Sequence, residues 1–206
     1  MITIINYGLG NIQAFVNVYK RLHIPVKVAT NAEQLTGASK LILPGVGAFD
    51  HAMQRLNASG MRQTLDDMII GQGVPVLGIC VGMQMLADSS EEGVLPGLGW
   101  IPGQVRSFHS VPESGELALP HMGWNDVLPT PGSPLFRGQQ ESWLFYFLHS
   151  YFFECAEPEH VAATATYGAG FSCSVSSKNV HGVQFHPEKS HHCGLALLKN
   201  FAELKC

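Results

Sequence analysis

The chain has 206 residues, of which 46% are hydrophobic and 14% are charged, so it is long and apolar enough to bury a sizeable core. Its formal net charge of −4 argues against nucleic acid or an anionic membrane surface as a partner. No apolar run approaches the roughly 20 residues of a spanning helix, and the N-terminus lacks the basic region and cleavage site of a signal peptide. We expect residues 1–206 to form a single domain.

The cysteines point to a reducing compartment. They are scattered, odd in number and without a Cys-x-x-Cys pair: Cys80, Cys155, Cys173, Cys193 and Cys206. Such a pattern is typical of free thiols. We therefore expect a cytoplasmic protein.

The first half of the chain alternates strands with helices. Apolar runs predict strands over residues 2–5, 26–28, 40–43 and 76–79, and helical spacing predicts helices over 12–22 and 49–70, the second broken near Ser59-Gly60. This alternation indicates an α/β sheet with parallel strands at its centre. Gly8 and Gly10 follow the first strand, but Gln13 stands where a dinucleotide-binding motif needs its third glycine, so that signal is weak.

The second half is richer in loops and hairpin-like strands. The pattern predicts loops over residues 89–93 and 97–103, strands over 104–108, 117–126, 143–153, 161–167, 171–176 and 180–185, and a closing helix over 194–204. Residues 111–115 are expected to be a flexible surface loop. The fold class is therefore α/β, with a mixed, mostly parallel central sheet flanked by helices and antiparallel at one side.

Residues 75–84 (PVLGICVGMQ) have the layout of a nucleophile elbow: strand, sharp turn, helix, with Cys80 at the tip. Gly78 and Gly82 flank it because a β-carbon at either place would collide with the crossing backbone. A helix N-terminus favours the thiolate, and the amide of Val81 is positioned to stabilise an oxyanion. The alternative is a buried core cysteine, since free cysteine is among the most buried residues.

A cysteine nucleophile needs a base, and the base needs an orienting group. His186-Pro187-Glu188 follows the last strand, whose end reaches the same rim as the elbow. Residues two apart in extended backbone point the same way, and the proline stiffens the placement, so His186 and Glu188 can face one site. Taken alone, the motif is also compatible with an ordinary turn.

Together, residues 77–84 (LGICVGMQ) and 182–188 (GVQFHPE) resemble the class I (triad) glutamine amidotransferases. Further motifs are similar to those of the glutaminase subunits of imidazole glycerol phosphate synthases: Asn6-Tyr7-Gly8, residues 43–49 (LPGVGAF), 119–125 (LPHMGWN) and 145–151 (FYFLHSY). The resemblance covers nearly the whole chain.

This resemblance implies an activity. Glutamine would be hydrolysed to glutamate and ammonia through a thioester on Cys80, with His186 as base and then acid and Glu188 orienting it. Ammonia would pass to a partner cyclase subunit, a (β/α)₈ barrel, in a heterodimer of histidine biosynthesis. The resemblance implies no metal or organic cofactor.

The resemblance also assigns single positions. It places Gly45, Val46, Gly47 and Val81 at the oxyanion hole, Gln84, Glu92, Ser150 and Tyr151 at the glutamine site, and Asn11, Trp124, Tyr146 and Lys189 at the face against the cyclase. The alternatives are that Trp124 and Tyr146 are core aromatics and that Lys189 is merely solvated.

The oxyanion strand reads Pro-Gly-Val-Gly, where the wider class has Pro-Gly-Gly. Valine resists a positive φ, so a peptide flip at Val46 is costly without help. We hypothesise that the hole is incomplete until the cyclase binds its ligand.

Other functions compete with this interpretation. A paralogous subunit would supply ammonia for amidation of a surface sugar. A dienelactone-type cysteine hydrolase would use a similar elbow, although its acid normally precedes the histidine. A metal-binding module would use His181, His186, His191, His192 and Cys193, which lack a clean ligand spacing. A non-catalytic subunit is disfavoured by the intact Cys80, His186 and Glu188.

Overall fold

The computed structural model describes residues 1–110, 117–138 and 142–205, so the loop expected at 111–115 lies outside the described residues. Its strands are β1 (Ile2–Ile5), β2 (Val26–Ala29), β3 (Lys40–Gly45), β4 (Val76–Cys80), β5 (Ser89–Ser90), β6 (Gly103–Ser107), β7 (His121–Pro129), β8 (Trp143–His149), β9 (Tyr151–Cys155), β10 (Val161–Tyr167), β11 (Ala169–Ser177) and β12 (Val180–Val183). Its α-helices are α1 (Ile12–Arg21), α2 (Ala32–Leu35), α3 (Phe49–Ala58), α4 (Arg62–Asp66), α5 (Val81–Gln84) and α6 (His191–Ala202).

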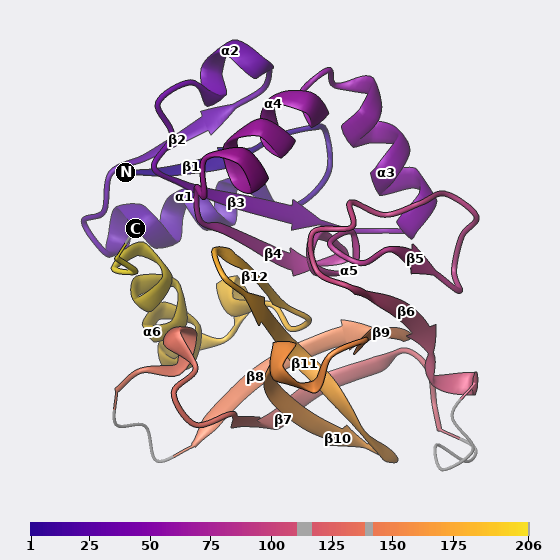
Figure 1. Cartoon of the computed structure of the whole chain (residues 1–206). Coiled ribbons are helices and arrows are strands. Elements are labelled where there is room, and N and C mark those ends of the chain that lie inside the picture. Colours follow the sequence, from indigo (N-terminus) through magenta and orange to yellow (C-terminus); the bar gives the residue numbers. More distant parts are fainter. Residues whose placement is uncertain (111–116, 139–141, 206) are drawn as a thin grey trace.

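A parallel half of the sheet positions the elbow. Strands β2, β1, β3, β4 and β12 lie side by side and run the same way (Figure 1). β4 is buried along its whole length, as expected of a central parallel strand. Cys80 at its carboxyl end pairs in register with Gly45 of β3, and Ile79 pairs with Val183 of β12. Three strand ends therefore meet at one rim.

An antiparallel half continues the sheet from β12 through β11, β10, β7 and β8. β9 pairs with β11 and with β6, which joins the short β5. Figure 1 shows this half below the parallel half, with α6 beside β8. The predicted mixed α/β sheet is confirmed.

Helices cover the parallel half on both faces. α1 packs with α6, while α2 packs with α4. The buried side chains of α1 are Phe15 and Tyr19, one turn apart, so its apolar stripe faces the sheet. The predicted break near Ser59-Gly60 is confirmed, with Gly60 at φ 72°.

Several boundaries differ from the prediction. The expected strand 143–153 is two strands, because the chain leaves the β8 line at Ser150. The strand expected from 117 begins only at His121, after Pro120, which has no N–H to pair. The expected loop 89–93 contains β5, and the closing helix starts at His191 instead of residue 194. Helix α2 was not predicted from the sequence; it has four residues and is capped by the Asn31 side chain, which accepts from the backbone N–H of Gln34 at 3.0 Å.

Candidate active site

The elbow at Cys80 is tightly built. Cys80 has φ 56° and ψ −118°, a backbone conformation that L-residues rarely adopt. A β-carbon on Gly82 would overlap the carbonyl oxygen of Leu43, and one on Gly78 would lie 2.5 Å from the carbonyl oxygen of Gly82. The predicted reason for the two glycines is confirmed. The helix that follows is a single turn, so it offers N–H groups to the thiol but little macrodipole.

His186 and Glu188 form a buried pair. Their side chains are 7% and 3% exposed, and Nδ1 of His186 lies 2.9 Å from Oε1 of Glu188. Nε2 of His186 is also buried and has no hydrogen-bonding partner within the described residues. Burial lowers the pKa of His186, but Cys80 and Glu188 outweigh that effect and raise it to about 9. The ring therefore has one nitrogen fixed by a carboxylate and the other available beside a thiol.

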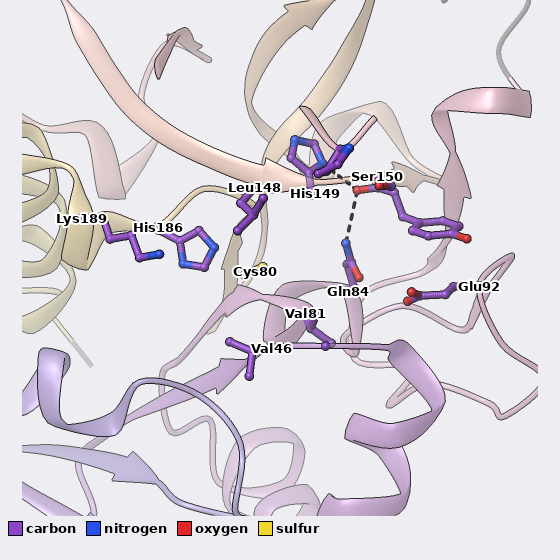
Figure 2. A pocket seen from close by; sticks show the side chains of 13 residues that line it. Val46, Cys80, Val81, Gln84, Glu92, Leu148, His149, Ser150, His186 and Lys189 are labelled. Atoms are coloured by element: carbon purple, nitrogen blue, oxygen red, sulfur yellow. Dashed lines mark hydrogen bonds between the residues drawn. The ribbon is translucent and has the colours of Figure 1, made fainter. Parts of the chain in front are cut away.

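Cys80 and His186 open into one cavity of about 320 Å³, at the lower end of the size range of small-molecule sites. It lies between the two halves of the sheet, with Val46 and Val81 on one side and His149 and Ser150 on the other (Figure 2). The full lining is Val46, Gly47, Cys80, Val81, Gln84, Glu92, Pro120, Leu148, His149, Ser150, Tyr151, His186 and Lys189. The structure thus gathers Cys80, His186 and the predicted glutamine-binding residues around one space, while Glu188 lies behind His186 and outside this lining.

The predicted substrate residues differ in how many of their polar atoms are already hydrogen-bonded within the protein. Oε2 of Glu92 accepts from the backbone N–H of Phe49 at 2.8 Å, and its carboxylate reaches the cavity. The Gln84 side chain is buried, and its Nε2 donates to the carbonyl oxygen of Tyr151 at 3.2 Å and to Oε1 of Gln184 at 3.1 Å. Only the carbonyl oxygen of the Gln84 amide is therefore left for a ligand.

The predicted oxyanion strand follows β3. Gly45 is in register with Cys80, and a β-carbon on it would lie against the amide of Gly82. Gly47 has φ 84°, whereas Val46 does not have a positive φ and is 40% exposed in the cavity. The peptide arrangement at Val46 is therefore the one that valine tolerates, and the flipped form is not adopted.

Three of the predicted partner residues, Trp124, Tyr146 and Lys189, lie together on one surface. Trp124 is 46% exposed, so the core alternative is wrong for it. Its ring stacks on His191 with centroids 5.2 Å apart and meets Tyr146 edge-on at 6.0 Å. Nζ of Lys189 lies 5.5 Å from the centre of the Tyr146 ring, which is half-buried. Lys189 also lines the cavity, so it joins this surface to the site.

Asn11 lies on the other side of the triad. Its side chain is exposed and caps α1, accepting from the backbone N–H of Ala14 at 3.3 Å. It borders a small cavity that His186 and Glu188 also line. Its assignment to the edge of the partner face stays a prediction.

Three buried polar residues near the site were missed. Gln184 lies two residues before His186, so strand alternation alone could have identified it. His121 and His149 face each other across β7 and β8, with Nδ1 of His121 3.0 Å from Nε2 of His149. That contact depends on strand pairing, which the sequence does not reveal.

The histidine-rich segment does not form a cluster. His181 is buried against Ser176, with Nδ1 2.8 Å from its Oγ, while His191 and His192 are exposed. In the part of the chain that the structure describes, no three His, Cys, Asp or Glu side chains come together in a way that could hold a metal ion. The metal-binding alternative gains no support.

The chain belongs to the class I glutamine amidotransferase family, since the family model "Glutamine amidotransferase class-I" matches residues 3–204. This membership removes the dienelactone-type alternative. Among described residues, no helix combines the length and apolar character needed to cross a bilayer.

The chain is similar over its whole length to proteins named "Imidazole glycerol phosphate synthase subunit HisH". The relative from Bdellovibrio bacteriovorus is 64% identical over 99% of this chain and 100% of its own length. The relative from Leptospira interrogans is 48% identical over the same shares.

Two solved structures show the same fold at low identity. "Crystal structure of glutamine amidotransferase" is 20% identical with a TM-score of 0.75, covering 98% of this chain and 97% of that one. "Structure of PurLQS from Thermotoga maritima" is 16% identical with a TM-score of 0.71, covering 97% and 96%.

Proposed function

We propose that this chain, as one domain, is the glutaminase subunit of an imidazole glycerol phosphate synthase. The observation that carries the proposal is the His186–Glu188 pair beside Cys80 at the rim of a substrate-sized cavity. Its setting in a chain 64% identical to a protein named for this complex selects the reaction. The four described cysteines are free thiols, which fits a cytoplasmic location.

In the first half-reaction, the Cys80 thiolate attacks the side-chain carbonyl carbon of glutamine. Negative charge develops on the carbonyl oxygen. The N–H group of Val81 donates to it, and an N–H group of residues 45–47 joins once the partner has completed the oxyanion hole. The His186 imidazolium, whose pKa is raised to about 9, gives its Nε2 proton to the departing nitrogen. The carbon–nitrogen bond breaks, ammonia leaves, and a glutamyl thioester remains on Cys80.

In the second half-reaction, His186 acts as a base. The neutral ring takes a proton from water, and the resulting hydroxide attacks the thioester carbon. The carbon–sulfur bond breaks, glutamate leaves, and the Cys80 thiolate is restored beside an imidazolium. Glu188 holds Nδ1 as a proton donor throughout, so Nε2 always faces the reaction.

The cavity offers recognition at its far end from Cys80. We assign the Glu92 carboxylate, which lines the cavity away from Cys80 (Figure 2), to the α-ammonium of glutamine. Ser150 and Tyr151, at the junction of β8 and β9, are assigned the α-carboxylate side. The free carbonyl oxygen of Gln84 is assigned the amide of the substrate.

An apolar surface supports a protein partner. The outward face of β7 and β8 exposes large apolar side chains, a pattern that marks interaction sites: Met122, Trp124, Leu128, Leu144 and Leu148. We assign this surface, together with Asn11, Tyr146 and Lys189, to the cyclase subunit, a (β/α)₈ barrel that would receive the ammonia. The Val46 backbone suggests that the barrel also completes the oxyanion hole.

The test is reconstitution. The purified chain is mixed with the candidate cyclase encoded by the same genome, and glutamate formation is followed with and without the cyclase's nucleotide substrate. We expect slow turnover alone and a large stimulation in the liganded complex. Equal turnover in both states would refute the incomplete oxyanion hole. Absence of any turnover with the cyclase, together with co-purification of another ammonia-consuming enzyme, would favour the paralogous sugar-amidation pathway.

A further inference from the structure

A run of buried hydrogen bonds leads from the backbone of the β8–β9 junction to the sulfur of Cys80. It passes through Gln184, which is fully buried and follows the end of β12. Nε2 of Gln184 lies 3.9 Å from Sγ of Cys80, and its Oε1 accepts from Nε2 of Gln84 at 3.1 Å. Nε2 of Gln84 also donates to the carbonyl oxygen of Tyr151 at 3.2 Å.

The direction of these bonds is fixed by the Tyr151 carbonyl. A carbonyl oxygen can only accept, so Gln84 must turn its NH₂ group toward it. The same NH₂ group faces Gln184, so Gln184 must present its oxygen to Gln84. The NH₂ group of Gln184 is then left facing Cys80, and the sulfur has an N–H donor.

Two neutral histidines continue the network on the other side of the same carbonyl, and His149 is the one that donates to it. Nδ1 of His149 donates to the Tyr151 oxygen at 2.8 Å, so Nε2 of His149 must accept from Nδ1 of His121 at 3.0 Å. Nδ2 of Asn125 donates to the carbonyl of Thr166 at 2.8 Å and lies 3.3 Å from Nε2 of His121, which independently fixes the same tautomer.

Burial keeps both histidines uncharged. It lowers the pKa of His121 to about 4 and that of His149 to about 3. At neutral pH, one assignment of donors and acceptors therefore satisfies every hydrogen bond of the network. The Tyr151 carbonyl is a fixed reference point for the Gln84 amide.

We propose that Gln184 is a further residue of the catalytic machinery, which donates an N–H to the Cys80 thiolate, and that Gln84 is the positioning residue that orients this donor. The proposal rests on the proposed function, in which Cys80 is the nucleophile. At 3.9 Å the contact is long for a neutral thiol, and it strengthens when the sulfur is an anion. The sulfur is an anion before attack on the amide and again when it leaves the thioester.

Other charged and titratable groups also lie around the sulfur or the cavity into which it opens. They are Tyr7 after β1, Glu92, His149 and Lys189 around the cavity, and His186 with Glu188 after β12. None of them is altered by the substitutions at Gln184 and Gln84. Because Gln184→Met adds no charge, it is the variant that isolates the amide donor, and the Glu variants add the effect of a carboxylate.

The test is the pH dependence of iodoacetamide labelling at Cys80 in the full chain, quantified by peptide mass mapping. Gln184→Glu replaces the donor by an acceptor, and we expect the midpoint to rise by at least one pH unit, with roughly tenfold slower labelling at neutral pH. Gln184→Met removes the donor without adding a charge, and is the deciding variant if the buried carboxylate prevents folding. Thermal unfolding checks that each variant is folded.

Gln84→Glu tests the orientation step without touching Cys80. A carboxylate at residue 84 would turn the Gln184 amide round and point its oxygen at the sulfur, so we expect labelling to slow about threefold, a fraction of the direct effect. Gln54→Glu, on the exposed side of α3, is the matched control and should label like wild type. A wild-type midpoint in folded Gln184→Met would overturn the proposal.

Turnover in the complex separates this inference from the proposed function. If Gln184 stabilises the thiolate, Gln184→Met lowers kcat at neutral pH, keeps the KM for glutamine, and recovers kcat as the pH is raised. A purely structural defect would not recover with pH. If wild type itself forms no glutamate with the cyclase, the proposed function fails, and the labelling result still decides whether Gln184 acts on the sulfur.

Discussion

The parallel and antiparallel halves of the sheet differ in what they leave exposed. In the parallel half, β4 is wholly buried and presents one reactive group, Cys80, at its end. In the antiparallel half, β7 and β8 alternate buried with exposed residues, and the exposed face is mostly apolar, with Met122, Trp124, Leu128, Leu144 and Leu148 around the single carboxylate of Asp126. The parallel half presents the proposed nucleophile, and the antiparallel half presents the face that we propose binds the partner.

The cavity lies where the two halves meet. The parallel half contributes Cys80 and Val46, and the antiparallel half contributes His149, Ser150 and Tyr151. His186 belongs to both, because its backbone N–H donates to the carbonyl oxygen of Tyr146 on β8 at 2.9 Å while its ring lies beside the elbow. A partner bound to the apolar face would therefore contact β8, the strand to which the backbone of His186, the proposed base, is hydrogen-bonded.

The largest expected effect comes from removing the nucleophile in the parallel half. We expect Cys80→Ala to abolish glutamine-dependent synthesis by the complex, because no thioester can form. Synthesis from added ammonium should survive, since the cyclase needs only ammonia. Both activities are measured in the same reconstituted complex. Loss of both would mean that Cys80 is needed for the structure of the complex.

The next effect concerns the pair that spans the halves. We expect Glu188→Gln to lower kcat by about 10²–10⁴-fold, because the imidazolium loses its orienting charge. The pKa of His186, raised to about 9 in wild type, should fall in this variant and also in Cys80→Ala. NMR titration of the ring measures it, and an unchanged value in both variants would contradict the assignment.

The same pair gives stability a pH dependence of known sign. A raised folded-state pKa stabilises the fold below the unfolded value of 6.5, and this contribution is lost as the pH rises through about 9. The difference in unfolding free energy between wild type and His186→Gln should therefore shrink across that window. Urea unfolding at several pH values checks it.

A smaller effect is expected on the apolar face. Trp124→Ala should weaken cyclase binding by about 2 kcal/mol, or roughly thirtyfold in Kd, as for a central aromatic anchor. Ile70→Ala is the matched control, because Ile70 is an exposed apolar residue of the parallel half, at 60% exposure. Isothermal titration measures both. Equal losses of cyclase affinity in the two variants would mean that the apolar face of the antiparallel half is not the specific binding surface.

The sequence predicted the parts of this site that are contiguous. Gly78, Cys80 and Gly82 must be close neighbours to make the elbow, and His186 and Glu188 must alternate in extended backbone. The strands of the parallel half were found for the same reason, since each is a short apolar run between turns. The family resemblance added residues such as Trp124, whose exposure no local pattern indicates.

The parts that were missed depend on contacts between distant segments. The bonding of Gln184 with Gln84 and Tyr151 arises only when β12, the elbow and the β8–β9 junction meet. The sequence pattern of residues 143–153 is a continuous β-type run, and no glycine or proline marks the break at Ser150. Helix α2 has only four residues, too few for a periodic pattern.

The smallest expected effect concerns Val46 of the parallel half. Its substitution should make glutamine turnover depend less on the partner bound to the antiparallel half. Val46 has no positive φ here, and valine opposes the peptide flip that would turn an N–H into the oxyanion hole. Glycine accepts a positive φ at little cost, so Val46→Gly should raise glutamine turnover of the free subunit about threefold to tenfold, for roughly 1 kcal/mol of strain removed. Turnover of the liganded complex should change little, because the flip is already driven there. Steady-state glutamate formation with and without the cyclase measures both. An increase of the same size in the complex would mean that residue 46 limits the chemistry itself and does not transmit the partner's state.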